Sequence, residues 1–133
     1  MVKTADYILK FNPDFYDSIR ENIKEATTRA NSGPVNIGDF VIATFEPSDK
    51  LLLLRIDEHY ARKLKDLTRY EAKAEGYYHE DLLKHELKNI YPTIGDDDYV
   101  YFYGFSNIRE KRSALQDFRS SYILEEGKWV AKK

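Results

Sequence analysis

The chain has 133 residues, of which 42% are hydrophobic and 33% charged, and this composition fits one globular domain with a single core. The longest apolar run, Leu51 to Leu54, is too short to span a bilayer, the first residues show no signal-peptide pattern, and we expect no membrane partner. The absence of cysteine excludes disulfides and thiolate zinc sites and favours a cytoplasmic location. The formal net charge of -2 disfavours a broad duplex-binding surface, but it is compatible with a pocket for one nucleoside.

The first third of the chain predicts a short strand followed by a helix. The strand covers residues 7–11, and Asn12-Pro13 is a typical helix start, with the asparagine as cap and the proline at the first helical position. The apolar residues that follow are four apart and share one helical face: Phe15, Ile19 and Ile23. We expect this helix to end near Asn22, with a turn at residues 31–34.

Two strands joined by a tight turn follow. Gly38-Asp39 precedes the apolar segment 40–45, and the turn covers residues 46–50. The run from Leu51 to Ile56 is apolar without alternation, which indicates a strand buried on both faces.

Two further helices are predicted in the second half. Thr68 and Glu71 have the spacing of a capping box, and the helix that they begin should stop at Gly76. A second helix is expected over residues 79–90 and ends before Pro92.

The end of the chain predicts a strand, a helix and a hairpin. An aromatic strand covers residues 99–105, a helix is expected near residues 109–118, and two short strands flank the turn at residues 125–127. This order of elements indicates the α+β class, with a small sheet or barrel that helices decorate.

The spacing of Lys24, Thr27 and Arg29, followed by Gly38-Asp39, resembles the entry motif of the ASCH family, which belongs to the PUA-like superfamily of β-barrels. The stretch from Leu67 to Pro92, LTRYEAKAEGYYHEDLLKHELKNIYP, resembles the two helices of that family. The resemblance implies a small PUA-like β-barrel and an ASCH domain over residues 1–106. Residues 107–133 are then a C-terminal extension, which we expect to pack on the same domain.

Two positions depart from the usual ASCH pattern. Asn22 stands where many members have glycine, and asparagine tolerates the left-handed backbone that such a turn needs. Thr27 stands where many members have glutamate, and this form resembles the small ASCH amidohydrolases that act on N4-acetylcytidine. That resemblance implies Lys24, Thr27 and Glu75 as the catalytic group.

The chemistry of amide hydrolysis leaves two roles open for these residues. Neutral Lys24 would activate the Thr27 hydroxyl as nucleophile. Alternatively, charged Lys24 would stabilise the oxyanion while Glu75 acts as base through water, and a glutamate beside the lysine favours this charged form. For substrate binding we expect Arg29, Tyr77 and Tyr78, since tyrosines near Glu75 can stack on a base.

Other functions stay open. The charged residues of the motif would also suit a solvated surface near the end of a helix. A non-catalytic module for single-stranded RNA would use Arg29 together with Arg109 and Arg112, since residues 107–133 carry a net charge of +3. The resemblance also allows an RNA-cleaving ASCH enzyme. The three histidines lack metal-ligand spacing and no glycine-rich phosphate loop occurs, so we expect neither metal nor cofactor.

Overall fold

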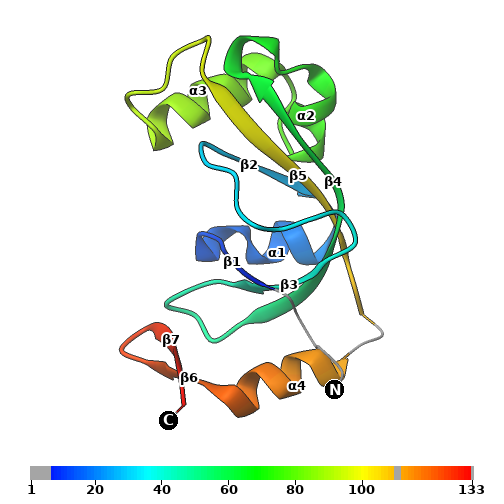
Figure 1. Ribbon diagram of the computed structural model, residues 1–133, viewed down its shortest axis with the longest axis vertical. Helices are drawn as coiled ribbons and strands as arrows, with labels where there is room; N and C mark the ends of the chain where they lie inside the picture. Colours follow the sequence, from blue (N-terminus) through cyan, green and yellow to red (C-terminus); the bar gives the residue numbers. More distant parts are fainter. Residues whose placement is uncertain (1–6, 110–111, 133) are drawn as a thin grey trace.

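The computed structural model describes residues 7–109 and 112–132, and it consists of a curled sheet with helices at both ends (Figure 1). Five of the described strands form this sheet in the order β1-β3-β4-β5-β2. Strands β1 and β3 are parallel, and the other neighbours are antiparallel. The strands are β1 (Tyr7–Lys10), β2 (Ala26–Arg29), β3 (Phe40–Thr44), β4 (Leu51–Lys63) and β5 (Tyr99–Asn107). The predicted α+β class is confirmed, and the sheet is a strongly curled half-barrel with β1 and β2 at its edges.

The apolar run at the start of β4 is buried on both faces, as predicted. Leu52 and Leu54 belong to the core inside the curl, whereas Leu51 and Leu53 belong to a second cluster on the outer face. The outer cluster exists because the C-terminal helix α4 (Arg112–Ser121) covers that face with Ala114 and Phe118. The apolar run lacks alternation because the C-terminal segment covers the second face of the strand.

A short helical segment fills the open side of the curl (Figure 1). It consists of a 3₁₀ turn, η1 (Pro13–Phe15), and the helix α1 (Tyr16–Arg20), and its Ile19 is buried in the inner core. The predicted cap is confirmed, because the side chain of Asn12 accepts a hydrogen bond from the Asp14 N–H at 2.9 Å.

The helices α2 (Arg69–Ala74) and α3 (Glu80–Ile90) cover the other end of the sheet. The capping box of Thr68 and Glu71 is present, and Gly76 ends α2 with a φ of +91°. Both features confirm the prediction. Helix α3 with Leu83 and Leu87, and α2 with Ala72, pack in one cluster with Val100 on the outer face of β5.

Strand β4 is longer than the sequence predicted. We expected it to end at Ile56, but it continues to Lys63, where the 3₁₀ turn η2 (Leu64–Asp66) begins. The polar residues beyond Ile56 break the apolar pattern, yet they pair with β5 after a register shift between Ile56 and Glu58. A β-bulge of this kind bends the strand and lets one strand serve two parts of a curled sheet.

The C-terminal segment folds into the predicted helix and hairpin. Helix α4 is followed by β6 (Tyr122–Glu125) and β7 (Lys128–Ala131), which pair antiparallel. Phe118 stacks on Tyr122 and meets the edge of Trp129, so that the helix and the hairpin share one cluster. The division at residue 106 stays a prediction. Among the described residues, no helix is long and apolar enough to cross a membrane.

Candidate functional site

A cavity of about 370 Å³ lies between the free edge of β2, the segment of residues 10–15 that ends in η1, the C-terminal end of α2 at Glu75, and α3. Its wall combines a few buried polar groups with aromatic and aliphatic side chains, which is the usual make-up of a small-molecule site. The polar residues are Lys10, Asn12, Lys24, Thr27, Thr28, Arg29, Glu75 and Glu86, and the others are Phe11, Phe15, Tyr77, Leu83, Leu87, Ile90 and Tyr91.

The carboxylate of Glu75 lies at the centre of the polar groups. Its Oε1 is 2.9 Å from the Lys24 Nζ, and its Oε2 accepts a hydrogen bond from the Thr28 hydroxyl at 2.6 Å. The side chains of this ion pair are only 5% and 7% exposed. The Lys24 ammonium also lies 4.7 Å from the ring centroid of Phe15. Because taking two charges out of water is costly, such a pair on a cavity wall is a candidate for function.

A turn and a backbone hydrogen bond bring Lys24 and Glu75 together although 51 residues separate them. Asn22, with a φ of +61°, reverses the chain after α1, which confirms the predicted left-handed turn. The N–H of Glu25 then donates to the Ala74 carbonyl at 2.6 Å. This bond holds the start of β2 against the last turn of α2. As a result, the side chain of Lys24, which precedes Glu25, meets the side chain of Glu75, which follows Ala74, at the cavity.

Thr27 also lines the cavity and is 7% exposed. It stands opposite Tyr103 of β5, whereas Thr28 stands opposite Phe102, so the two threonines belong to opposite faces of β2. Within the described residues the Thr27 hydroxyl makes no hydrogen bond, in contrast to that of Thr28. Thr27 therefore differs from its neighbour in having a hydroxyl that no group in the described part of the chain holds.

Arg29 separates this cavity from a second one of about 410 Å³, and it lines both. Its guanidinium donates to the Lys10 carbonyl at 2.8 Å and lies 5.2 Å from the ring centroid of Phe11. Burial lowers the pKa of Arg29, while Tyr91, Tyr103 and Glu75 act against that shift. No described carboxylate forms an ion pair with this guanidinium, which leaves most of its donors for a ligand.

The two predicted tyrosines have different surroundings. Tyr77 lines the cavity, and burial raises the pKa of its phenol, with a further contribution from Glu75. Tyr78 is 91% exposed and is absent from the cavity wall. A ring that points into water does not stack on a ligand in this cavity, so the structure places only Tyr77 where we expected both.

Among the residues of the cavity wall that sequence reasoning missed are Thr28, Phe15 and Tyr91. We expected the preceding Thr27 at the site instead of Thr28, because strand alternation places Thr27 on the same face as Arg29. Phe15 was assigned only to a helical face. Tyr91 had a usable signal, since it lies inside the IYP ending of the resemblance.

A larger cavity of about 640 Å³ is lined by residues of β4, β5 and α2 together with Asn22 and Glu25, and it does not contain Lys24 or Glu75. Two of its three acidic groups are engaged: Asp57 binds Arg55 and Ser106, and Glu58 accepts from the Tyr70 hydroxyl. Across residues 7–109 and 112–132, no three His, Asp or Glu side chains group as metal ligands would. We therefore assign the candidate site to the smaller cavity with the buried ion pair.

Comparison with known proteins gives a match in structure alone. No protein-family model matches the chain, and no curated protein matches it significantly in sequence. The ASCH domain of Lactobacillus crispatus JV V101 superposes with a TM-score of 0.65 at 13% identity, over 76% of this chain and 78% of that one.

Two further solved structures have a similar fold. The ASCH protein of Zymomonas mobilis gives a TM-score of 0.60 at 10% identity and covers 94% of this chain and 87% of its own. A protein of Enterococcus faecalis V583 gives 0.59 at 16% identity, over 81% and 82% of the two chains. The curled sheet, the helices at its end and these superpositions together show that the chain has the ASCH-like fold.

Proposed function

We propose that the cavity binds a nucleoside and that the protein hydrolyses the amide of an N4-acylated cytidine. The observation that carries this proposal is the buried set of Lys24, Glu75 and Thr28 on the wall of a cavity with aromatic sides. A volume of about 370 Å³ lies in the range of small-ligand sites.

The aromatic side chains of the wall suit a flat heterocycle. Phe11 and Phe15 come from the segment that leaves β1, and Tyr77 and Tyr91 come from the two ends of the α3 region. Stacking of a base on an aromatic ring contributes about 1–3 kcal/mol to the free energy of binding, whichever base it is. The hydrocarbon walls also exclude water from the polar groups, which strengthens their electrostatic effect on a reacting amide.

The hydrogen bond between Lys24 and Glu75 supports the mechanism in which the lysine is charged. Glu75 takes a proton from a water molecule that attacks the acyl carbon, and the Lys24 ammonium stabilises the oxyanion. The C–N4 bond then breaks, and the proton passes from Glu75 to N4. The products are cytidine and the carboxylic acid of the acyl group, which releases its proton to solvent as it ionises.

Thr27 has two possible contributions, and one variant separates them. As nucleophile, its hydroxyl would form an acyl ester that water later cleaves, so Thr27→Val would abolish turnover. In the water mechanism, Thr27 positions the substrate, and Thr27→Val would raise KM more than it lowers kcat. Thr27→Ser is the matched control, because it keeps the hydroxyl and should retain turnover in both cases.

The experiment that tests the proposal follows the release of acetate from N4-acetylcytidine. We expect turnover by the wild type and a loss of at least about 100-fold in Glu75→Gln, because the base is lost while the shape is kept. Lys65→Ala is the control, since Lys65 forms an exposed ion pair with Asp97 far from the cavity. Absence of turnover by the wild type, or full turnover by Glu75→Gln, would refute the enzymatic part.

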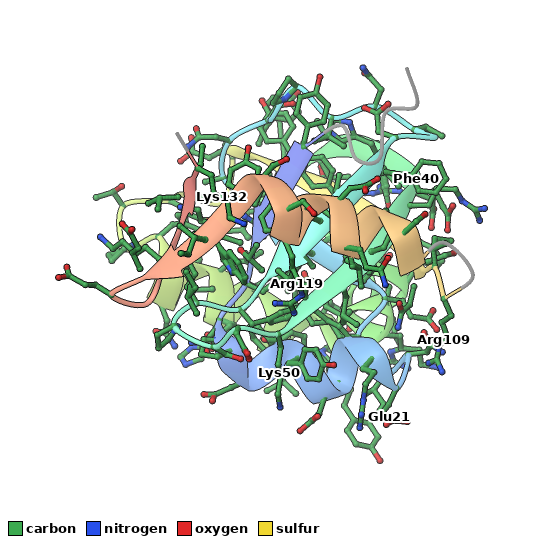
Figure 2. All side chains as sticks on the ribbon, turned by 90° about the horizontal axis from the view of Figure 1, so that it is seen from below. Glu21, Phe40, Lys50, Arg109, Arg119 and Lys132 are labelled. Carbon is green, nitrogen blue, oxygen red and sulfur yellow. The ribbon has the colours of Figure 1, made fainter. Side chains whose placement is uncertain are left out.

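A second candidate function is RNA binding, and the basic residues around α4 favour it. Figure 2 shows Lys50, Arg109, Arg119 and Lys132 on the face that α4 crosses. Lys50 stacks over Tyr16 and Arg119 over Trp129, so aromatic rings are interleaved with cations. The Arg112 side chain, which we also predicted to contribute, lies outside the described part of the chain.

RNA binding and nucleoside binding respond differently to salt. Affinity for single-stranded RNA through this face should fall steeply with ionic strength, and Arg119→Ala should reduce both the affinity and the slope. Affinity for a nucleoside in the cavity should be nearly independent of salt. RNA binding that is insensitive to salt and to Arg119→Ala would contradict a role of this face.

A further inference from the structure

The inner edge of the cavity is formed by the backbone of β2 along the edge that no other described strand pairs with. Strand β2 has β5 as its partner and is the last strand of the sheet. Thr27, Thr28 and Arg29 all line the cavity although consecutive side chains of a strand point to opposite faces. One cavity can touch all three only if it lies along the free edge of the strand.

The register shows which backbone groups point from this edge. The Phe105 N–H donates to the Glu25 carbonyl, so Glu25 and Phe105 form a hydrogen-bonded pair. In an antiparallel ladder such pairs alternate, and the next ones are Thr27 with Tyr103 and Arg29 with Tyr101. The N–H and C=O of Thr28 therefore point away from β5, towards the cavity.

No described group satisfies these two atoms. The backbone hydrogen bonds of residues 7–109 and 112–132 include none from the Thr28 N–H or to its carbonyl. Ala26 has the same orientation, but it is 0% exposed and does not line the cavity. Thr28 thus presents one donor and one acceptor side by side in a partly buried place, where unpaired backbone groups are rare.

We propose that the main-chain N–H and C=O of Thr28 read the base, by pairing with the adjacent N3 acceptor and N4–H donor of an N4-acylated cytosine. This inference rests on the proposed function and specifies how its substrate is recognised. Enzymes that bind a single base commonly read its Watson–Crick edge through hydrogen bonds. Because the Thr28 hydroxyl donates to Glu75, this pairing sets the scissile amide beside the buried carboxylate.

The cavity has room for a flat group but not for an added peptide strand. At one end Lys24 is held back, because its N–H donates to the Ser18 carbonyl at 3.0 Å. At the other end the Arg29 guanidinium crosses to the Lys10 carbonyl. Between these two closed ends Thr28 is the outward-facing residue that lines the cavity, and it suits a single donor–acceptor pair, which a pyrimidine supplies.

The test compares cytidine, which is the product of the proposed reaction, with 3-deazacytidine, in which C–H replaces N3. Nucleoside affinity is measured by NMR titration of the full chain. We expect wild type to bind cytidine roughly tenfold more tightly, because the analogue leaves the Thr28 N–H without a partner. This arm needs no variant, so it does not depend on how a substitution folds.

The second arm removes the donor from the protein. Thr28→Pro deletes an N–H that faces away from β5, and proline is tolerated on such an edge. Thr28→Val is the matched control, because it loses the same hydroxyl but keeps the N–H. We expect Thr28→Val to retain the preference for cytidine and Thr28→Pro to bind both nucleosides equally.

The outcomes separate this inference from the proposed function. Equal binding of both nucleosides by the wild type, or a retained preference in Thr28→Pro, would overturn the role of the Thr28 backbone. Neither outcome would contradict the proposed function. An extended peptide that pairs with the Thr28 N–H, with no nucleoside bound, would overturn it as well. If wild type binds neither cytidine nor N4-acetylcytidine, the proposed function fails and the inference with it.

Discussion

Two glutamates one turn apart at the end of the sheet, Glu71 and Glu75, have almost fully buried side chains and accept hydrogen bonds on both carboxylate oxygens, yet their surroundings differ. Glu71 accepts from the Thr68 N–H at 2.7 Å, from the Thr68 hydroxyl at 2.9 Å and from the Tyr60 hydroxyl at 2.7 Å. Glu75 instead binds the Lys24 ammonium and the Thr28 hydroxyl, from a segment some fifty residues away.

The difference between the two carboxylates lies in what they face. Glu71 is 0% exposed, and its partners fix the start of α2 as a capping box does. Glu75 lines the cavity with its ion-pair partner. Burial and hydrogen bonding are thus common to a structural and a candidate functional carboxylate, and access to a cavity distinguishes them.

The largest effect is expected when the Lys24–Glu75 pair is broken from one side. Lys24→Met leaves the Glu75 carboxylate buried without its cation, which should lower the free energy of unfolding by about 3–5 kcal/mol. The double variant with Lys24→Met and Glu75→Gln should recover much of that stability but no turnover. Urea unfolding of the three proteins checks this, and an equally unstable double variant would contradict it.

Removal of the other glutamate should harm the fold and spare the cavity. Glu71→Ala leaves the Thr68 N–H and the Tyr60 hydroxyl without their acceptor, and we expect a loss of about 3 kcal/mol in unfolding free energy. Nucleoside affinity of the folded protein, measured well below its melting temperature, should stay within about twofold of wild type. A tenfold weaker affinity would mean that the two glutamates are not separable.

A smaller effect is expected at the turn that delivers Lys24 to Glu75. Asn22 has a φ of +61°, a conformation that costs most side chains roughly 1–2 kcal/mol. Asn22→Ala should therefore lower stability by about 1 kcal/mol, whereas Asn22→Gly should be neutral or slightly stabilising. Thermal unfolding of both variants measures the contrast, and equal melting temperatures would exclude backbone strain as the reason for asparagine.

The smallest effect concerns alkaline pH. Burial and the hydrogen bond to Glu71 raise the pKa of Tyr60 well above its usual range, and burial and Glu75 raise the pKa of Tyr77. Since both phenols are favoured neutral in the folded state, their contribution to stability is complete below pH 10 and is lost as the pH rises above that value. Tyr60→Phe should show a shallower decline of unfolding free energy above pH 10. Identical slopes in wild type and variant would contradict this.

Much of the local structure was predictable because its causes are local. Asn12, the pair of Thr68 and Glu71, and Gly76 each act on backbone groups within a few residues, and their caps and turns lie where the sequence placed them. The apolar run from Leu51 was also informative, because a strand without alternation needs cover on both faces.

The candidate site was predictable only in part. The spacing of Lys24, Thr27 and Arg29, read through its resemblance to ASCH proteins, brought together residues that line one cavity, with Glu75 and Tyr77. It did not separate Thr27 from Thr28, because two adjacent threonines in an extended segment have no local feature that says which one meets a distant carboxylate. Tyr78 was expected at the cavity for its type and position, and the backbone turns it into solvent.

The sequence by itself determined where α2 and α3 start and stop, and the turn residues that allow the chain to reverse at Asn22 and Gly76. Only the tertiary structure decided that Glu75 binds Thr28 and that β4 continues to Lys63. It also decided that the backbone of Thr28 faces the cavity, since β2 pairs with β5 on one side alone. The physical reason is distance along the chain: caps and turns act within a few residues, whereas strand pairing joins segments whose sequences carry no mark of each other.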